Sequence, residues 1–293
     1  MKKMLHHIKG SGVILSILAA FIFSISGLIL KLLSSRIPFT ESAFFRSFFG
    51  LIMVSVYMLS NGYSFKVKSK KGLLLRGLFG GIAMMFYFYG IYKIKLGEVS
   101  ILFQLAPVFV VIFALWFLKE RLPKFFYALI VLSVIGVLMI IKPGFGSFEG
   151  FAPFIVVLAA IFSALAYICV RELSKEHRVH IIVFYFCIVS TIVTIPFAYE
   201  FIIPSPYELF LLIMLGAVAT LSQFIMTKAY SLEQAGVVSM LSYVGVFFSV
   251  AWGFLIWGEE LDVYSIIGGI IIIASCSILS YKIYTKNKLN VYN

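Results

Sequence analysis

The chain has 293 residues, of which 62% are hydrophobic and only 12% are charged. A soluble domain carries roughly 25% charged residues, so this composition excludes a water-soluble globular protein and indicates a protein that lies in the lipid bilayer. The formal net charge of +12 is unusual for such a chain, and its distribution, described below, accounts for it without nucleic acid as a partner.

Apolar residues fall in blocks of about 17 to 24 residues. At 1.5 Å per residue, each block is long enough to cross a hydrocarbon core of about 30 Å as a helix. The first block is longer than the apolar part of a signal peptide and is followed by no small-residue cleavage site, so we expect it to be retained. The predicted spans are Ser11–Leu33, Ser42–Ser60, Gly72–Tyr92, Val99–Leu118, Phe125–Ile141, Phe151–Val170, Ile181–Tyr199, Tyr207–Tyr230, Val237–Trp257 and Val263–Ile283.

Ten spans place both termini on the same side of the membrane, and the basic residues indicate which side this is. Eighteen lysines and arginines fall on the side of the termini and five on the other, with Arg46 inside a span. By the positive-inside rule, both termini are cytoplasmic and the protein lies in the plasma (inner) membrane. The partners expected are the lipid bilayer and a small-molecule substrate; nucleic acid is not expected, and a homodimer is left open.

The second half of the chain repeats the first. A shift of 140 residues aligns Leu18-Ala19-Ala20 with Leu158-Ala159-Ala160, and a shift of 139 aligns Glu120-x-Leu122 with Glu259-x-Leu261. Each unit has five spans, an odd number, so the second unit enters the membrane from the opposite side. The sequence therefore predicts an all-α polytopic membrane protein with ten transmembrane helices, arranged as two inverted five-helix repeats, residues 1–145 and 146–293, around a central cavity.

Several kinds of chemistry have no candidate residues in this sequence. All four histidines lie in flanking or loop segments, and no span contains an HExxH pattern or a carboxylate pair. No GxxxxGK[ST] loop is present, and no buried His or Asp accompanies the serines and threonines of the spans. We therefore expect no metal site, no cofactor and no enzyme activity.

Polar side chains inside the spans are costly in hydrocarbon, so they are the first candidates for a transport pathway. Arg46, in the second span, either contacts a substrate or has a structural role, in which it extends to the headgroups or pairs with Glu41 or Glu98. Gln104 lies near the middle of the fourth span, and the repeat pairs it with Tyr243.

Other positions complete the predicted site. Pro107 removes a backbone N–H and predicts a helix kink at mid-membrane, with a simple packing kink as the alternative. Gln223 and Lys228 belong to an unusually polar eighth span, where Lys228 alternatively extends to the cytoplasmic edge. Glycines at positions 77, 80, 81 and 216 are expected to let the third and eighth helices approach closely. The predicted substrate-binding residues are Arg46, Tyr87, Ser100, Gln104, Gln223, Lys228, Ser239 and Tyr243.

Local motifs resemble a known group of transporters. Phe45-Arg46, Leu75-Arg76-Gly77, the stretch from Pro107 to Glu120 and Gly258-Glu259 together resemble the drug/metabolite transporter superfamily, EamA type, over nearly the whole chain. The stretch 223–230 is similar to the eighth helix of a branch that includes S-adenosylmethionine carriers. The resemblance implies a central cavity formed by helices one to four and six to nine. Val246 stands where the first repeat has Pro107, so the two halves need not bend alike.

These observations predict a secondary transporter, a permease or exporter of a small organic metabolite that works by alternating access. The substrate expected is amino-acid-like or nucleoside-like, with S-adenosylmethionine among the candidates. Because the predicted cavity has aromatic, amide and basic groups but no deep carboxylate, a zwitterion or anion suits it better than a multivalent cation. The alternatives are a non-transporting lipid-handling or accessory membrane protein and, third, a channel.

Overall fold

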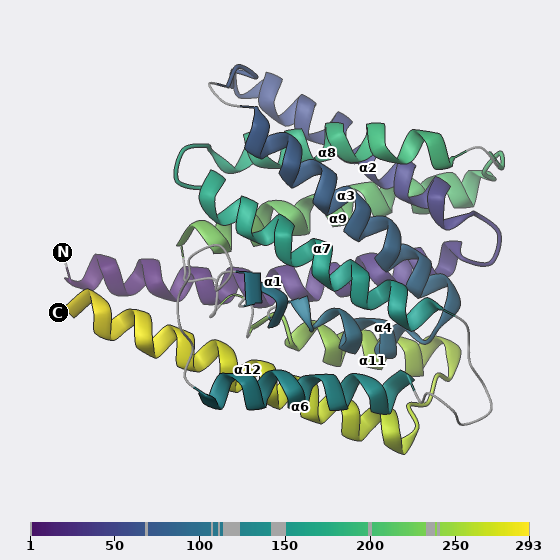
Figure 1. Cartoon of the computed structure of the whole chain (residues 1–293). Coiled ribbons are helices and arrows are strands. Elements are labelled where there is room, and N and C mark those ends of the chain that lie inside the picture. Colours follow the sequence, from purple (N-terminus) through teal and green to yellow (C-terminus); the bar gives the residue numbers. More distant parts are fainter. Residues whose placement is uncertain are drawn as a thin grey trace.

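The computed structural model describes residues 2–67, 70–106, 108–110, 112–113, 124–141, 151–198, 201–232, 238 and 241–292, and all regular structure in these ranges is helical (Figure 1). In chain order the elements are α1 (Lys2–Leu33), α2 (Phe39–Ser60), α3 (Lys71–Lys93), α4 (Leu96–Phe103), α6 (Lys124–Ile141), α7 (Ala152–Leu173), α8 (Val179–Thr194), the 3-10 turn η1 (Ile195–Phe197), α9 (Pro206–Leu232), α11 (Val244–Trp257) and α12 (Val263–Tyr292).

Each predicted span overlaps one of these helices. Within the described ranges, six helical stretches, from α1, α2, α3, α7, α8 with η1, and α9, are long and apolar enough to cross a membrane. Shorter apolar stretches lie in α4, α6, α11 and α12. An all-α polytopic membrane protein is therefore confirmed, while the count of ten crossings and the inverted symmetry stay predictions.

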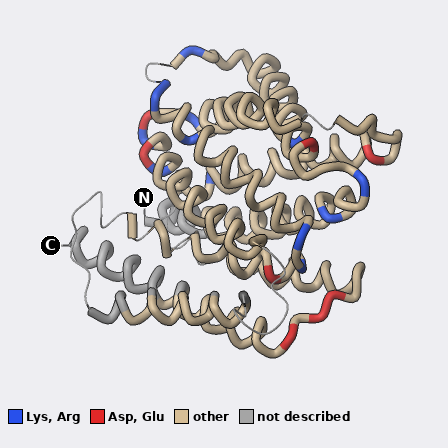
Figure 2. Tube along the Cα trace, turned by 45° about the vertical axis from the view of Figure 1, so that its right-hand side comes forward, with Lys and Arg blue, Asp and Glu red and all other residues tan. Residues whose placement is uncertain are grey.

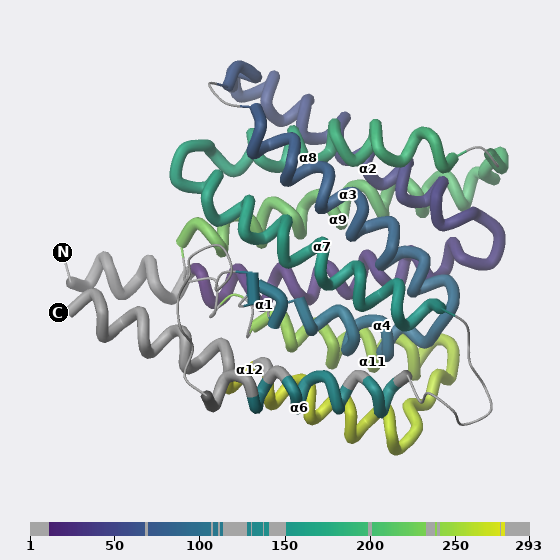
Figure 3. Tube along the Cα trace, in the orientation of Figure 1, coloured from purple at the N-terminus to yellow at the C-terminus, as the bar shows by residue number. Residues whose placement is uncertain are grey.

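The helices pack in pairs drawn from the two halves of the chain. Helix α3 packs along α7, α1 along α9, and α2 along α8 and α9, whereas α6 and α12 pack mainly on each other along one edge of the bundle (Figures 1 and 3). Helix α1 begins and α12 ends at the same end of the molecule (Figure 1). We call this the amino end, and the opposite end, where α1 finishes at Leu33, the Lys31 end.

Most charged residues lie away from the middle of the bundle. Figure 2 shows Lys, Arg, Asp and Glu mainly in the connections and at helix ends, with a largely uncharged band between them. Large apolar side chains are exposed on the outer faces of this band, for example Val56 at 56% and Leu221 at 51%. This distribution matches a lipid-facing surface, because exposed apolar side chains are stable where hydrocarbon replaces water.

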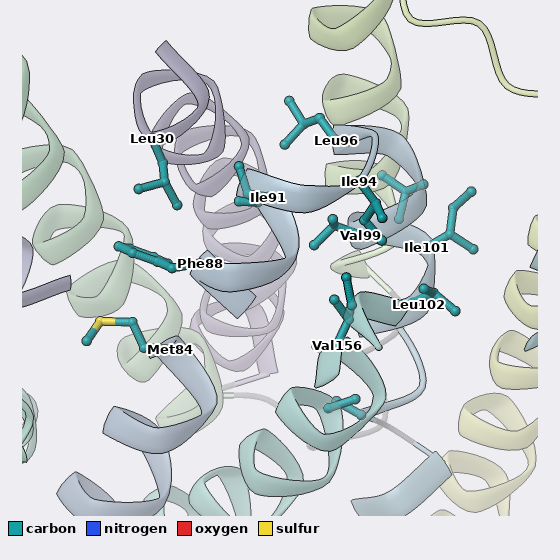
Figure 4. Packing of buried hydrophobic residues seen from close by; sticks show 14 of the residues in the cluster. Leu30, Met84, Phe88, Ile91, Ile94, Leu96, Val99, Ile101, Leu102 and Val156 are labelled. Atoms are coloured by element: carbon teal, nitrogen blue, oxygen red, sulfur yellow. The ribbon is translucent and has the colours of Figure 1, made fainter. Parts of the chain in front are cut away.

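A continuous apolar core holds the short helix α4 in place. Leu96, Val99 and Leu102 of α4 have no exposed surface and pack with Phe88 of α3 and Val156 of α7 in the same cluster (Figure 4). A helix of this length is unstable alone, so its position depends on this tertiary packing. The core thereby fixes the point where the chain enters the turn at Gln104.

Small residues permit close helix contacts, but between other helices than the sequence predicted. A Cβ added at Gly77 would collide with Val189 of α8, and one at Gly81 would lie 3.3 Å from the Cα of Ser190 of the same helix. A Cβ at Gly216 would lie 2.6 Å from the Cβ of Phe49 of α2. The third and eighth predicted spans correspond to α3 and α9, and the predicted close contact between them was wrong. The glycines of α3 instead bring it against α8, and Gly216 brings α9 against α2.

Replacing Gly216 by leucine is expected to lower the free energy of unfolding by about 1–3 kcal/mol, the usual cost of overpacking a close contact. The added side chain has to displace the α2 backbone near Arg46, whose carbonyl oxygen would lie 3.4 Å from the new Cβ. The melting temperature in detergent measures the effect. Met214→Leu, on an exposed position of the same helix, is the control, and equal melting temperatures for the two variants would contradict the prediction.

Candidate functional site

A cavity of about 200 Å³ lies inside the bundle. Its lining comes from α1, α2, α3, α4, α7, α8 and α9, together with residues 104, 106, 238 and 242. Of the described residues, none in α6 or α12 contributes to the lining. The fifth and tenth predicted spans correspond to α6 and α12. The family resemblance implied this arrangement, in which these two helices support the others from outside the cavity.

Two arginines and one phenylalanine form the most unusual part of the lining. Arg46 of α2 and Arg76 of α3 are 4% and 3% exposed. The guanidinium carbons of Arg46 and Arg76 lie 4.9 Å and 4.3 Å from the centre of the Phe186 ring of α8. Both cations therefore contact the same aromatic ring, which is attractive by about 2 kcal/mol for a desolvated pair.

Neither arginine has an acidic partner in the part of the chain that the structure describes. Nη1 of Arg46 and Nε and Nη1 of Arg76 are buried and form no hydrogen bond with any described residue. Glu41, a partner proposed from the sequence, instead accepts a hydrogen bond from the backbone N–H of Ile202, at 3.0 Å. Glu98, the other proposed partner, accepts a hydrogen bond from the Ser265 hydroxyl at 3.2 Å. The interpretation of Arg46 as a side chain that reaches the headgroups or pairs with Glu41 or Glu98 was wrong, because Arg46 is buried against Phe186.

Gly80 leaves space in the cavity wall for the side chain of Arg76. A Cβ added at Gly80 would collide with Nη1 of Arg76. Gly80 lies one helical turn after Arg76, so the absence of a side chain there allows the guanidinium to fold along α3 toward Phe186. The glycine thus leaves room for a cationic group in the wall of the cavity.

Two breaks in the helices form part of the cavity wall, and hydrogen bonds join one break to the other. The chain turns at residues 104–105, after α4, and at residues 242–243, before α11, two places that the 139-residue shift nearly superposes. The Gln104 amide donates to the Ser242 carbonyl oxygen at 3.1 Å, and the Ser242 hydroxyl donates to the Gln104 side-chain oxygen at 3.1 Å. These partly buried bonds satisfy polar groups that the interrupted helices leave without helical partners.

Replacing Gln104 by leucine is expected to cost about 1–3 kcal/mol of stability, because the Ser242 carbonyl and hydroxyl lose this partner in a partly buried setting. Ser242→Ala removes only one of the two bonds and leaves the other acceptor satisfied, so the expected loss is smaller. Melting temperatures of the two variants test this order. A larger loss for Ser242→Ala than for Gln104→Leu would rule out the reciprocal bond as the reason.

The structure brings some predicted site residues together and leaves others apart. Arg46, Tyr87, Gln104 and Gln223 all line the central cavity. Ser100 and Tyr243 are buried next to it without being part of its lining. Lys228 is exposed and lines a different cavity on the outer side of α9. Ser239 and the kink at Pro107 fall outside the described residues.

Three lining residues that matter for the chemistry were not predicted from the sequence. Arg76 was counted among the bases of the cytoplasmic side, although it lies within the predicted third span. Tyr167 of α7 and Tyr230 of α9 stack with ring centres 5.5 Å apart. The signal available for Arg76 was its position four residues before Gly80, on the same face of α3.

At the Lys31 end, charged groups join three segments that are distant in the sequence. Glu259, which follows α11, forms an ion pair with Lys31 of α1 and accepts the backbone N–H of Leu96, at the start of α4, at 2.9 Å. Lys95 donates to the carbonyl oxygen of Glu260 at 2.7 Å. The side chains of Lys31 and Glu259 are 13% and 15% exposed. This network ties α1, α4 and α11 together beyond the Lys31 end of the cavity.

The sequence profile of the EamA-like transporter family matches twice, over residues 10–142 and 150–281. The chain belongs to the EamA-like transporter family. One solved crystal structure superposes on it with a TM-score of 0.65 over 92% of this chain and 96% of that chain, at 17% sequence identity, which bears on the fold alone.

Relatives of this EamA-like protein are named as transporters in both directions. It is 38% identical to the pseudopaline exporter of Pseudomonas aeruginosa, over 92% of this chain and 96% of the relative. It is 29% identical to the S-adenosylmethionine uptake transporter of Rickettsia conorii, over 88% of each chain. The expectation of a membrane transporter of a small metabolite, and not an enzyme, is thereby confirmed, and the accessory and channel alternatives lose support.

Proposed function

We propose that this protein exports a small organic anion through the central cavity by alternating access. The observation that carries the proposal is the pair of buried arginines, Arg46 and Arg76, in a cavity whose described lining contains no acidic residue. A buried charge without a partner is costly, so it is expected where a ligand supplies the opposite charge. A guanidinium binds a carboxylate with two parallel hydrogen bonds, which gives both strength and orientation.

The remaining lining favours an amino-acid-like metabolite with an apolar or aromatic portion. Nε2 of Gln223 has no hydrogen-bond partner among the described residues, so it is available to donate to a substrate carbonyl or carboxylate. Tyr87, Tyr167 and Phe186 supply apolar surface around it. An S-adenosylmethionine-like substrate shares the carboxylate and an aromatic base, and it is the second candidate because of the uptake transporters among the relatives.

Export is favoured over uptake by two arguments. The identity to the named exporter, 38%, exceeds the 29% to a named uptake transporter. The excess of basic residues on the side of the termini supports cytoplasmic termini in the plasma (inner) membrane, which makes the Lys31 end the outer one. With Lys31 and Glu259 paired at that end, the cavity is poised to receive a solute from the cytoplasm.

A binding and transport assay tests this proposal. Thermal stability of the purified protein is measured with amino acids, polycarboxylate amino-acid conjugates, S-adenosylmethionine, nucleosides and matched carboxamide analogues. The carboxylates are expected to raise the melting temperature and their carboxamides are not, because only a carboxylate carries the charge that pairs with a guanidinium. A ligand at 100 times its dissociation constant adds about 2.7 kcal/mol to the free energy of unfolding, which is measurable as a shift in melting temperature. The stabilising compound is then loaded into proteoliposomes, where saturable release is expected. Stabilisation only by compounds that lack a carboxylate would contradict a carboxylate-binding site.

A further inference from the structure

A second cavity, of about 700 Å³, lies at the amino end of the bundle. Its lining comes from α1, the end of α2 and the connection after it, the connection between α7 and α8, the start of α8, and α9. We call it the Lys228 cavity. Helix α9 separates it from the central cavity, since Gln223 and Tyr230 line the central cavity whereas Phe224 and Lys228 line the Lys228 cavity. The Lys228 cavity is therefore a separate site on the outer surface of the bundle.

The lining of the Lys228 cavity is strongly basic. It contains one acidic residue, Glu176, and five basic ones, Lys175, His177, Arg178, His180 and Lys228. Lys175 pairs with Glu172, at 2.7 Å, but Arg178 and Lys228 form no ion pair with any residue that the structure describes. Two cationic side chains are thus available for an anionic group.

Two histidines form an ordered, partly buried part of the cavity wall. His180 is 9% exposed and stacks on Tyr63, with ring centres 4.2 Å apart and planes at 8°. Nε2 of His177 is shielded from solvent and has no hydrogen-bond partner within the described ranges. A buried ring nitrogen without a partner is unusual, and an anion or hydroxyl of a bound ligand would satisfy it.

Below the basic residues, the same helices present apolar side chains to the membrane. One helical turn toward the middle of the bilayer from the lining residues Leu15, Tyr57 and Phe224 lie Leu18, Met53 and Leu221. These three side chains are 41%, 42% and 51% exposed. Tyr57 packs edge-on against Phe224, at 5.6 Å, between the two zones. A charged site directly above an exposed apolar stripe matches a phospholipid, whose phosphate and acyl chains are arranged in the same order.

We propose that the Lys228 cavity binds the phosphate of an anionic phospholipid, with Arg178 and Lys228 on the phosphate and the acyl chains along Leu18, Met53 and Leu221. Arginine and lysine near a bilayer surface each contribute about fivefold to the affinity for anionic lipid. The lipid would join α1, α2 and α9 to the connection between α7 and α8. This site is independent of the solute proposed for the central cavity.

The test uses the full-length protein in phosphatidylcholine nanodiscs with and without about 20% phosphatidylglycerol, an anionic lipid that attracts basic residues. Anionic lipid is expected to raise the melting temperature of the wild type, and Arg178→Gln combined with Lys228→Gln is expected to reduce the apparent lipid affinity about thirtyfold. Lys70→Gln combined with Lys71→Gln removes two exposed bases of the same end that do not line the cavity, and it should keep the wild-type affinity. Arg178→Lys combined with Lys228→Arg keeps the charge and should also keep most of the affinity.

Three outcomes would overturn the proposal. Equal losses in the two glutamine pairs would show that general surface charge, and not this cavity, attracts the lipid. Stabilisation by millimolar inorganic phosphate, with no further gain from phosphatidylglycerol, would identify a free phosphate as the ligand. The Arg178→Lys, Lys228→Arg variant could lose as much lipid affinity as the Arg178→Gln, Lys228→Gln variant. That result would mean that the substitutions disturb the folding of the connection between α7 and α8, and not the charge of the cavity.

Discussion

Replacing Arg76 by methionine is expected to abolish transport while the ligand-free protein stays at least as stable as the wild type. The Arg76 guanidinium is buried, and its Nε and Nη1 form no hydrogen bond with the described residues. Among the described residues, the contact with Phe186 offsets part of the lost hydration, by about 2 kcal/mol. Methionine has a similar reach without charge, so it removes the cost of burial while preserving most of the packing.

The same substitution removes the group that would bind the substrate anion. A hydrogen bond to a charged group contributes about 1.5–3 kcal/mol, so the affinity should fall by a factor of about ten to a hundred or more. Arg46→Met should behave alike, because Arg46 contacts the same ring and has an unpaired Nη1. Transport in proteoliposomes and melting temperature are measured on the same preparations. This opposite movement of stability and activity is typical of residues retained for function.

Two further variants separate a binding role from a structural one. Arg76→Lys keeps the charge but loses the planar fork, so partial transport with weakened affinity is expected. Lys70→Met removes an exposed base just before α3 and should change neither property. A fall of several degrees in the melting temperature of Arg76→Met, with transport lost in proportion to the folded protein, would assign Arg76 to structure instead.

Much of the helical architecture follows from the sequence because the bilayer imposes it. A chain in hydrocarbon has to satisfy every backbone N–H and C=O within each segment, so long apolar blocks become helices with few alternatives. This is why the predicted blocks and the observed helices overlap throughout the described ranges. The exceptions lie at the turns near Gln104 and Ser242, where side-chain hydrogen bonds between distant segments replace helical ones.

Helix geometry alone could have excluded Lys228 from the central cavity. Residues five apart in a helix point about 140° away from each other, so Gln223 and Lys228 cannot face one cavity, whereas Gln223 and Tyr230, seven apart, lie within about 20°. The structure places them accordingly, with Tyr230 lining the central cavity and Lys228 the outer one. Grouping residues by span without regard to helix face was the source of this misplacement.

Burial of Arg76 could not be read from the sequence in the same way. A base near the start of a span is typical of the cytoplasmic interface, and the positive-inside count treated it so. Its actual environment is created by Phe186, 110 positions further along the chain, and by the packing of α3 on α8 through Gly77 and Gly81. Only the tertiary arrangement reveals that two arginines from different helices share one ring.

The ion pair at the Lys31 end is expected to control which side of the central cavity is open. Replacing Lys31 by methionine leaves Glu259 without its cation in a setting that is only 15% exposed. Removing one partner of a fully buried pair costs about 3–5 kcal/mol, and partial exposure makes the cost here smaller. Glu259 joins α1, α4 and α11 in this structure. If the cavity alternates as proposed, opening the Lys31 end would separate these segments, so we expect the cost to fall on the closed state. Each shift of about 1.4 kcal/mol changes the ratio of the two states tenfold.

Accessibility of a cavity cysteine measures that shift. Ser26 lines the central cavity, so Ser26→Cys, in a background in which the native cysteines are replaced, reports entry of a membrane-impermeant maleimide from outside. Lys31→Met is expected to raise the labelling rate about tenfold. Lys95→Met, which removes an exposed bond to the Glu260 carbonyl, should raise it far less, because exposed pairs contribute little.

Exchanging the two charges provides the decisive comparison. Lys31→Glu combined with Glu259→Lys restores the ion pair but not the bond to the Leu96 N–H, since a lysine cannot accept it. Labelling should therefore fall back only part of the way toward the wild-type rate. If the exchanged pair labelled as fast as Lys31→Met, the attraction between these two residues would not be what closes the Lys31 end. If Lys31→Met labelled at the wild-type rate while losing thermal stability, the network would hold the fold together without gating the cavity.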